Sequence, residues 1–476
     1  MTTDAIDRLV VIDVAGVDAE GDGIGLVEGR TIAVAGTVPG EQVEVRVRDG
    51  SRAQGRADLV RVVRASANRV VPRCRHAAVC GGCAWQHIAY AEQLRLKRDR
   101  LQRLLAAALG AKAPVVDPMV GMTPQPDEPA APPGCDPQAP WHFRHKVSFV
   151  FGPGRHARSL DMGHYQRASK VVVPVEECPV HAEAGNVLAF AVRDALLAAR
   201  VPGASEDGQR GLVRHVVARV SHCQPEVLVT LVVTANDKLL RAPVRRVLDG
   251  ANPPDGFHLN VHDRPGPSLF GTSTRKLHGR DRLREEIAGV SFLVSPTSFF
   301  QTNVRAAEVL LDMVSAAIAG GKSWRVLDLY AGAGLFALPL AKRGHAVTAV
   351  EESAESIADG EATRWFSKIP DEACRFVRGR VEELIGSRPG GLAGAPRPDG
   401  VVLDPPRAGC PKRVLGAIVR GVRPARIVYV SCNPDALARD LALAAAGGYR
   451  VDRVRPVDMF PHTAHIEAVA VLSPAR

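Results

Sequence analysis

The sequence predicts an α/β protein in three parts: a small N-terminal β-barrel, a central α+β domain and a doubly wound parallel α/β sheet. From about residue 291, buried strand-like runs alternate with helical runs, which is typical of parallel strands joined by crossover helices. The N-terminal part instead contains short alternating apolar runs broken by Gly and Pro, which is typical of an antiparallel barrel. We expect domains at 1–66, 67–290 and 291–476.

Charge indicates a polyanionic partner without proving one. The 476 residues carry a formal net charge of +10, with a pI of about 9.3. Basic residues outnumber acidic ones from Arg46 to Arg100. Such a surface suits the phosphate backbone of a nucleic acid, but a solvated barrel face has the same composition, so both interpretations stay open.

The compartment decides how clustered cysteines are interpreted. No apolar run approaches the roughly 20 residues that cross a bilayer. The first residues, MTTDAIDRLVVIDVAG, lack the cationic start and apolar core of a signal peptide. We therefore expect a cytoplasmic protein without membrane contact. In that reducing compartment, clustered cysteines are metal ligands or nucleophiles more often than disulfide partners.

The central part begins with a cysteine cluster, Cys74, Cys80 and Cys83, in RCRHAAVCGGCAWQH. Leucines at helical spacing follow, and Gly110 is a plausible helix stop. Residues 114–140 are rich in Pro and should form an exposed loop or linker. The later strand-like runs, from FRHKVSFVF to GFHLNVHD, predict a mixed or antiparallel sheet covered by one helix, NVLAFAVRDALLAAR.

A Gly-rich turn, from Asp328 to Gly334, closes the first strand of the predicted parallel sheet. Gly332 and Gly334 let the backbone approach a ligand closely. Glu351 ends the next strand, where an acidic residue bonds ribose hydroxyls. The third glycine of the dinucleotide fingerprint is missing, so S-adenosylmethionine fits better than NAD. A plain tight turn is the alternative.

Three further strand ends carry polar residues that should face the same cleft: Asp404 in LDPPR, Cys432 in YVSCNP and Glu467 in HTAHIE. The alternatives are a solvated Asp, a buried inert thiol and, for the two His of HTAHIE, a weak metal signal. Close to a cationic sulfonium, Cys432 is expected to have a lowered pKa and to act as a nucleophile. Glu467 would then serve as a general base.

A thiol, a base and S-adenosylmethionine together have a specific use. Carbon 5 of uracil is a poor nucleophile until a thiolate adds to carbon 6 and turns the ring into an enolate. Carbon 5 then attacks the methyl group, and a base removes the carbon-5 proton so that the thiolate can leave. Methylation at nitrogen needs neither group, so the pair favours carbon-5 methylation.

Taken together, these motifs make the chain resemble the RNA (uracil-5-)-methyltransferase family over nearly its whole length. These are class I S-adenosylmethionine enzymes with an N-terminal TRAM barrel of the OB type. The motifs follow in the family's order: GIG and VPGE in the barrel, then SFFQTN, DPPR, SCNP and HTxHxE. The resemblance implies that Cys432 is the nucleophile and Glu467 the base. It implies cofactor contacts for Gln301, Tyr330, Glu351 and Asp404.

The resemblance also interprets the cysteine cluster. The branch of the family that modifies 23S ribosomal RNA carries Cys-x5-Cys-x2-Cys and a distant fourth Cys before a Pro, which hold a [4Fe–4S] cluster. Cys74, Cys80 and Cys83 fit that spacing, Cys178 in ECPV fits the fourth position, and Cys135 has no matching context. All-thiolate ligation suits iron–sulfur and zinc alike. The resemblance favours a structural iron–sulfur cluster.

We therefore expect a monomeric enzyme that forms 5-methyluridine in 23S ribosomal RNA, at a uridine flipped out of a loop. The same chemistry on transfer RNA is the alternative within this class. A non-catalytic RNA-binding ribosome-assembly factor is the alternative outside it. The presence of both Cys432 and Glu467 argues against the latter, because a pure binder needs neither.

Overall fold

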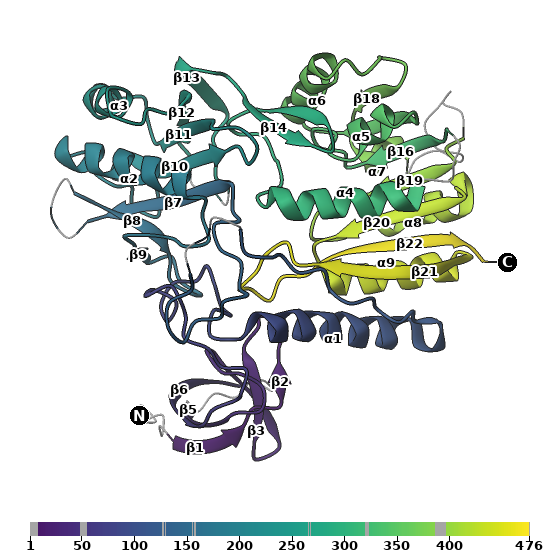
Figure 1. The fold of residues 1–476 in the computed structure, drawn as a ribbon, viewed down its shortest axis with the longest axis horizontal. Coiled ribbons are helices and arrows are strands. Elements are labelled where there is room, and N and C mark those ends of the chain that lie inside the picture. The colour runs from purple at the N-terminus through teal and green to yellow at the C-terminus, as the bar shows by residue number, and fades with distance from the viewer. Residues whose placement is uncertain are drawn as a thin grey trace.

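The computed structural model describes residues 8–47, 55–125, 128, 130–154, 156, 159–264, 266, 268–318, 323–385 and 397–475. Figure 1 shows a small barrel at one end of the molecule, helix α1 (Tyr90–Leu109) beside it, and two large sheets beyond that helix. No helix in these ranges is both long enough and apolar enough to span a membrane.

Six strands form the barrel sheet, in the order β1-β5-β6-β4-β3-β2. Val43 and Val45 are fully buried because their side chains share the inward face at the two-residue period of a strand. This confirms the strand-rich barrel; residues 1–7 and 48–54 lie outside the described part. The strands are β1 (Arg8–Asp13), β2 (Gly16–Val17), β3 (Gly23–Val27), β4 (Arg30–Val34), β5 (Gln42–Val47) and β6 (Gly55–Arg64).

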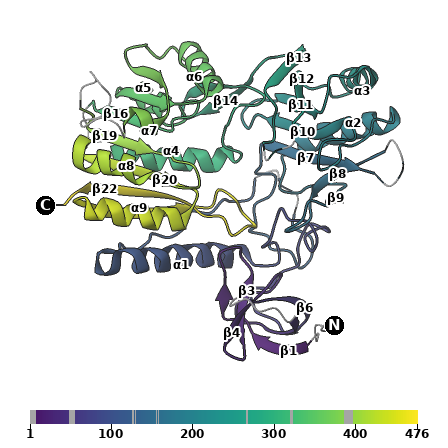
Figure 2. The ribbon, with the colours of Figure 1, turned by 180° about the vertical axis from the view of Figure 1, so that it is seen from behind.

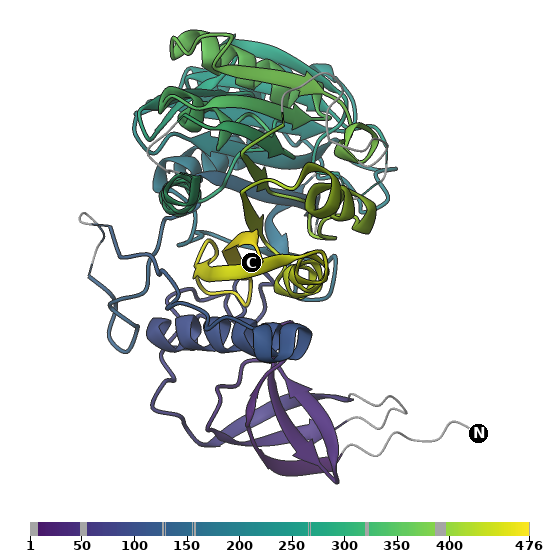
Figure 3. The ribbon, with the colours of Figure 1, turned by 90° about the vertical axis from the view of Figure 1, so that its right-hand side faces the viewer.

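Helix α1 lies between the barrel and the rest of the molecule (Figure 3). Leu101 and Leu105, one helical turn apart, are fully buried where α1 packs on α9 (Pro434–Ala446). Gly110 follows the last helical residue with φ 56°, in the left-handed region that Gly adopts readily. The predicted helix and its stop are therefore confirmed.

The prediction of an exposed loop over residues 114–140 is wrong for its first part. Val116 is fully buried and forms a bridge with Val454 on the edge strand β21 (Tyr449–Val457). A Pro-containing stretch can run along a strand, because such a pairing does not use every backbone N–H. Residues 126, 127 and 129 lie outside the described part.

The central sheet has seven strands in the order β13-β12-β11-β10-β7-β8-β9, and it is mixed, as predicted, because only β11 and β12 pair in parallel. Two helices share its core, α2 (Glu183–Ala198) and α3 (Arg241–Leu248), so the prediction of one covering helix is wrong. The sequence of α3, RAPVRRVL, is short, charged and contains Pro, which hides its helical period. The strands are β7 (Lys146–Pro153), β8 (Leu160–Tyr165), β9 (Val172–Pro174), β10 (Val213–Val220), β11 (Val227–Val233), β12 (Gly256–Val261) and β13 (Ser273–Gly279).

The second large sheet has the strand order β18-β17-β16-β19-β20-β22-β21. Its first five strands are parallel, and β22 (Glu467–Pro474) runs antiparallel between β20 and β21. The parallel strands are β16 (Arg325–Leu329), β17 (Ala346–Glu351), β18 (Cys374–Arg378), β19 (Gly400–Leu403) and β20 (Arg426–Ser431). The helices of this part, besides α9, are α4 (Val304–Ile318), α5 (Ala337–Lys342), α6 (Ala354–Phe366), α7 (Val381–Leu384) and α8 (Lys412–Ala417).

Helices cover both faces of this sheet. Val428 of β20 belongs to the core that contains α4 and α5, whereas its neighbour Ile427 belongs to the core that contains α8 and α9. Successive strand residues point to opposite faces, so each face has its own helical layer. Figure 2 shows α4 and α9 flanking β20 and β22. The predicted doubly wound sheet is confirmed.

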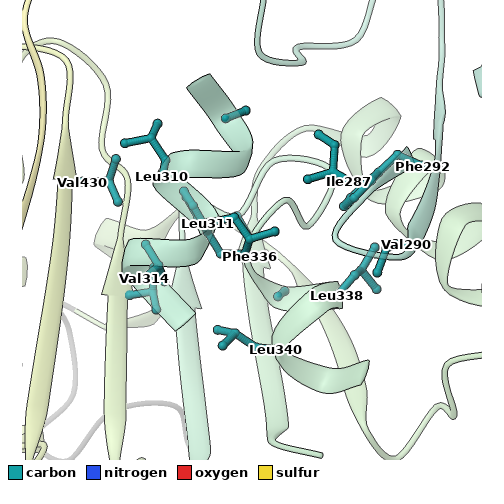
Figure 4. Packing of buried hydrophobic residues seen from close by; sticks show 14 of the residues in the cluster. Ile287, Val290, Phe292, Leu310, Leu311, Val314, Phe336, Leu338, Leu340 and Val430 are labelled. Atoms are coloured by element: carbon teal, nitrogen blue, oxygen red, sulfur yellow. The ribbon is translucent and has the colours of Figure 1, made fainter. Parts of the chain in front are cut away.

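A hairpin, β14 (Leu283–Ile287) and β15 (Val290–Val294), spans the domain boundary that we expected at 290/291. Figure 4 shows Ile287, Val290 and Phe292 among side chains of α4 and α5. These residues are fully buried in the same hydrophobic core as those helices. The hairpin therefore packs with the doubly wound sheet.

Candidate active site and cysteine cavity

The strand order brings most of the predicted site residues to one edge of the doubly wound sheet. β17, β16, β19 and β20 are parallel neighbours, so their carboxyl ends meet at the same edge. Glu351, the Gly-rich turn, Asp404 and Cys432 lie at these ends. β22 runs the other way, so its first residue, Glu467, lies at this edge too.

The Gly-rich turn after β16 is tied to Glu351. The backbone N–H of Gly332 donates to Oε2 of Glu351 at 2.9 Å. Gly332 and Gly334 have φ of 56° and 85°, a region that favours Gly. A Cβ on Gly334 would lie 2.9 Å from the ring of Phe376, so the turn also packs too tightly for a side chain there. The Tyr330 hydroxyl donates to Glu382 at 3.0 Å.

Carboxyl groups crowd this edge. Asp328 on β16 is fully buried, and both its side-chain oxygens lack a hydrogen-bond partner. Burial, together with Asp404 and Glu351, raises the pKa of Asp328 well above its usual range. Burial also raises the pKa of Asp404 to about 7. Asp328 was not among the predicted site residues, although a charged residue inside the apolar run RVLDL was a signal for it.

Cys432 and Glu467 lie at the adjoining ends of two neighbouring strands. Ser431 pairs with Ala468, so continuing this antiparallel register by one residue sets Cys432 opposite Glu467. Burial, then the carboxyls of Glu467 and Asp404, raise the pKa of Cys432 to about 11. Burial raises the pKa of Glu467 well above its usual range, and Asp404 adds to the effect.

The protein's own groups therefore raise the pKa of Cys432 instead of lowering it, contrary to the expectation. The expectation rested on a nearby cationic sulfonium, which belongs to the cofactor. In the protein alone, the nearest charged groups include two carboxyls, and negative neighbours disfavour a thiolate. Arg407 opposes them and lowers the pKa values of both Cys432 and Glu467. Arg407 stands in the DPPR motif but was assigned no role from the sequence.

The loop around Cys432 is fixed by Asn433. Its Oδ1 accepts the N–H of Asp435 at 3.0 Å and caps α9. Its Nδ2 donates to the carbonyl oxygen of Arg407 at 2.8 Å. The SCNP and DPPR motifs are thus joined by one side chain, which holds Cys432 and Arg407 in a fixed relation.

Gln301 is half-buried in the loop that leads into α4. The contacts that hold this loop belong to its neighbours. Arg219 donates to the carbonyl oxygens of Pro296 and Ser298, and the N–H of His145 donates to the carbonyl oxygen of Thr302 at 2.7 Å. The structure fixes the loop without joining Gln301 itself to the other predicted residues.

The other predicted set, Cys74, Cys80, Cys83 and Cys178, lines one cavity between the cysteine segment and the central sheet. Burial raises the pKa of Cys83 to about 11, and the thiols of Cys80 and Cys74 add to it. Cys83 and Cys74 act in the same way on Cys178, whose pKa is about 12. The fold therefore brings together four thiols that lie up to 104 residues apart in the sequence.

Histidines complete the wall of this cavity. Cys178 Sγ lies with a ring nitrogen of His164 and one of His181 in a group whose atoms are all within 4.8 Å of one another. His76 lines the cavity too. One nitrogen of each of these three histidines is buried without a hydrogen-bond partner. Cys135 lies in a turn after Pro132 and is not among the described residues that line the cavity.

The doubly wound sheet, its Gly-rich turn and the acid on the next strand define a class I S-adenosylmethionine-dependent methyltransferase. Residues 396–474 match the family described as tRNA (uracil-5-)-methyltransferase, and residues 9–60 match the TRAM domain. An RNA methyltransferase of Gloeobacter violaceus is 35% identical over 98% of this chain and 96% of its own length. One of Listeria monocytogenes is 32% identical over 95% of each chain.

A solved structure shows the same architecture. The tRNA (uracil-54, C5)-methyltransferase of Pyrococcus abyssi, in complex with S-adenosyl-L-homocysteine, superimposes with a TM-score of 0.74 and 26% identity. The match covers 97% of this chain and 99% of that one. The chain belongs to the RNA (uracil-5-)-methyltransferase family and uses S-adenosylmethionine.

Proposed function

We propose that the protein forms 5-methyluridine in 23S ribosomal RNA by covalent catalysis, with Cys432 as nucleophile and Glu467 as general base. The observation that carries this proposal is the register of β20 and β22, which sets the thiol opposite the carboxyl at the edge where the Gly-rich turn and Asp404 also lie. Neither group has a use in methylation at nitrogen or in RNA binding alone.

The reaction uses the side chains of Cys432 and Glu467 one after the other. The Cys432 thiol gives its proton to solvent and its sulfur bonds to carbon 6, while the electrons of the carbon 5–carbon 6 double bond move toward the carbon-4 carbonyl oxygen to form an enolate. S-adenosylmethionine supplies the methyl group that carbon 5 takes up. Glu467 then removes the carbon-5 proton, the double bond re-forms and the Cys432 sulfur leaves as a thiolate.

The raised pKa of Glu467 suits this task. A carboxylate that burial makes reluctant to ionise is a stronger base once it is ionised, and it keeps the proton it has taken. Arg407 limits the shift for both groups, so it favours the ionised forms that the two steps need.

We propose cofactor contacts at the strand ends of this edge and, in addition, at Gln301 in the loop before α4. Glu351 accepts from Gly332 through Oε2 and from Ser353 through Oε1, so its carboxylate is held rigidly and still has lone pairs for ribose hydroxyls. The open space at Gly332 leaves room for a ligand against the backbone. The proposed set is Gln301, Tyr330, Gly332, Gly334, Glu351 and Asp404.

The cysteine cavity fits a [4Fe–4S] cluster. Four thiolates that bind one zinc ion at about 2.3 Å would lie roughly 3.8 Å from one another. Within the described residues, the ligand atoms that all lie within 4.8 Å of one another belong to His164, Cys178 and His181, and the four cysteine sulfurs do not form such a group. Four thiols that line one cavity without forming so close a group are compatible with the larger [4Fe–4S] cluster. Cluster sulfur can accept hydrogen bonds from the histidine nitrogens that lack a partner, where these carry a proton. The Gly82 N–H already donates to Cys80 Sγ at 3.4 Å. We assign Cys74, Cys80, Cys83 and Cys178 as its ligands, in a structural role.

Transfer RNA is the second candidate substrate, because the Pyrococcus abyssi enzyme of the same architecture is a tRNA methyltransferase. The cysteine cavity favours ribosomal RNA through its resemblance to the cluster-containing branch. Mapping 5-methyluridine in both RNAs from cells that lack the protein separates the two substrates.

The covalent mechanism is tested with RNA that contains 5-fluorouridine. Fluorine cannot be removed as a proton, so the reaction stops after methyl transfer, with the uracil ring still bonded to the Cys432 sulfur. Wild type with cofactor should give a protein–RNA adduct that survives denaturing electrophoresis, and Cys432→Ala should give none. Equal amounts of adduct from both proteins would favour a non-catalytic RNA-binding factor.

A further inference from the structure

The segment that leads to Glu467 is held by parts of the chain that are remote in sequence. We call residues 458–466, which join β21 to β22, the base loop. Figure 1 shows it, in yellow, reaching past the start of α1. At its centre His462 is buried and has φ 64°, a left-handed conformation that a non-Gly residue keeps only when its surroundings enforce it.

His462 is fixed on every side. Its N–H donates to Oε1 of Gln93 at 2.8 Å, and its carbonyl oxygen accepts the N–H of Trp85 at 2.9 Å. Its ring Nε2 lies 2.9 Å from the carbonyl oxygen of Pro140, and the ring stacks on Trp141 at 4.1 Å. Its other ring nitrogen, Nδ1, is buried without a hydrogen-bond partner. The four contacts nevertheless make His462 a structural residue of the loop.

A buried ion pair holds the start of the same loop. Lys97 of α1 lies 2.6 Å from Asp458, and neither side chain is exposed. Lys97 also donates to the carbonyl oxygen of Phe460 at 3.1 Å. Buried pairs are weak stabilisers, because both charges lose their hydration, but a displacement that separates them leaves each charge buried and uncompensated.

Gln93 connects the base loop to the cysteine segment and, through Trp85, to the barrel. Its Nε2 donates to the carbonyl oxygens of Ile88 at 2.8 Å and of Trp85 at 3.1 Å. Trp85, two residues after Cys83, donates from its indole to the carbonyl oxygen of Gly21 in the barrel at 2.7 Å. The barrel, the cysteine segment and α1 therefore converge on the base loop.

We infer that Gln93 and Lys97 are positioning residues for Glu467, so that the N-terminal half of the chain controls the proton-removal step of the reaction. This inference rests on the proposed role of Glu467. The carboxylate must come within hydrogen-bond reach of the carbon-5 proton, and a displacement of about 1 Å costs a large part of the rate. Cys432 has a further support outside the base loop, because the side chain of Asn433 caps α9 and donates to the carbonyl oxygen of Arg407. We therefore expect its addition to carbon 6 to depend less on the base loop than proton removal does.

Loss of the Gln93 side chain should slow the removal of the carbon-5 proton and leave the earlier steps intact. In Gln93→Leu, Cys432 still adds and the methyl group is still transferred, but the carbon-5 proton leaves slowly. We therefore expect the methylated covalent adduct to accumulate on ordinary uridine RNA, as we also expect for Glu467→Gln. We expect turnover to fall about tenfold or more, while the affinity for S-adenosylmethionine is unchanged. The readouts are adduct on a denaturing gel and 5-methyluridine in released RNA.

Asn260→Leu is the matched control. Asn260 is a fully buried amide in the central sheet that, like Gln93, bridges backbone groups: it donates to the carbonyl oxygen of Gly271 at 3.0 Å and accepts that residue's N–H at 2.7 Å. Its loss should lower thermal stability without accumulating adduct. If Gln93→Leu does not fold, the double variant Lys97→Met/Asp458→Leu decides, because it replaces the ion pair with apolar side chains of similar size.

The outcomes separate the two claims. If Glu467→Gln itself accumulates no adduct, the proposed role of Glu467 is wrong. If Glu467→Gln accumulates adduct but the folded base-loop variant turns over at the wild-type rate, or loses activity without adduct, the positioning role is wrong.

Discussion

The protein carries two thiol environments that differ in their neighbours. Cys432 stands at a strand end beside Glu467, Asp404 and Arg407, so charged groups surround it. Cys83 and Cys178 stand mainly among other thiols and histidines in one cavity. Burial raises the pKa of all three, to about 11 for Cys432 and Cys83 and about 12 for Cys178. The pKa alone does not separate a nucleophile from a ligand; the neighbouring groups do.

A nucleophilic thiol and a metal-binding thiol need different neighbouring groups. A nucleophile needs a base and a cation whose charges change its ionisation during the reaction, and Cys432 has both within electrostatic reach. A cluster ligand needs further thiols at a suitable distance, and it gains its charge compensation from the metal. The two sets can therefore be disturbed independently.

A substitution in the cysteine cavity should abolish metal binding, and this is the strongest change that we predict. Cys178→Ala removes one of the four proposed ligands, so anaerobically purified protein should lose its brown colour and its iron, which in the wild type should approach four atoms per chain. Cys135→Ala is the control and should keep both. A colourless wild type that holds one zinc ion would overturn the iron–sulfur assignment and favour the group of Cys178, His164 and His181.

A smaller effect is expected from pH at the other site. The pKa of Glu467 is raised in the folded protein, so between its unfolded value near 4.5 and its folded value the native state binds more protons than the unfolded state. Stability is then lost as pH rises through this window, by at most about 1.4 kcal/mol per pH unit. Glu467→Gln removes this loss, so urea unfolding should show it gaining on wild type from pH 5 to pH 8.

Glu352→Gln is the control for that titration, because Glu352 is 69% exposed. It should follow wild type at every pH. A Glu467→Gln curve parallel to wild type would mean that Glu467 is not buried in the way the structure shows.

Much of this could be predicted from the sequence, because the signals are local. The strand and turn patterns predict the doubly wound sheet, and they place Asp404 and Cys432 at strand ends where parallel topology makes them neighbours. The spacing of Cys74, Cys80 and Cys83 is likewise local, whereas Cys178 was found only through the family resemblance.

The rest could not be predicted, because it depends on contacts between distant segments. The raised pKa of Cys432 depends first on its burial by distant segments, then on Glu467, which comes 35 residues later, and on Asp404. The burial of Val116 depends on its pairing with Val454. The support of the base loop by Gln93 joins residues 369 positions apart, and no periodicity or motif marks it.

The rate of methyl transfer from labelled S-adenosylmethionine to RNA by the Cys432→Ala variant tests the central claim most directly. We predict a fall of at least about 10³-fold, the scale of losing a covalent nucleophile, with iron content and thermal stability unchanged. Methyl transfer at the wild-type rate would contradict the covalent mechanism outright.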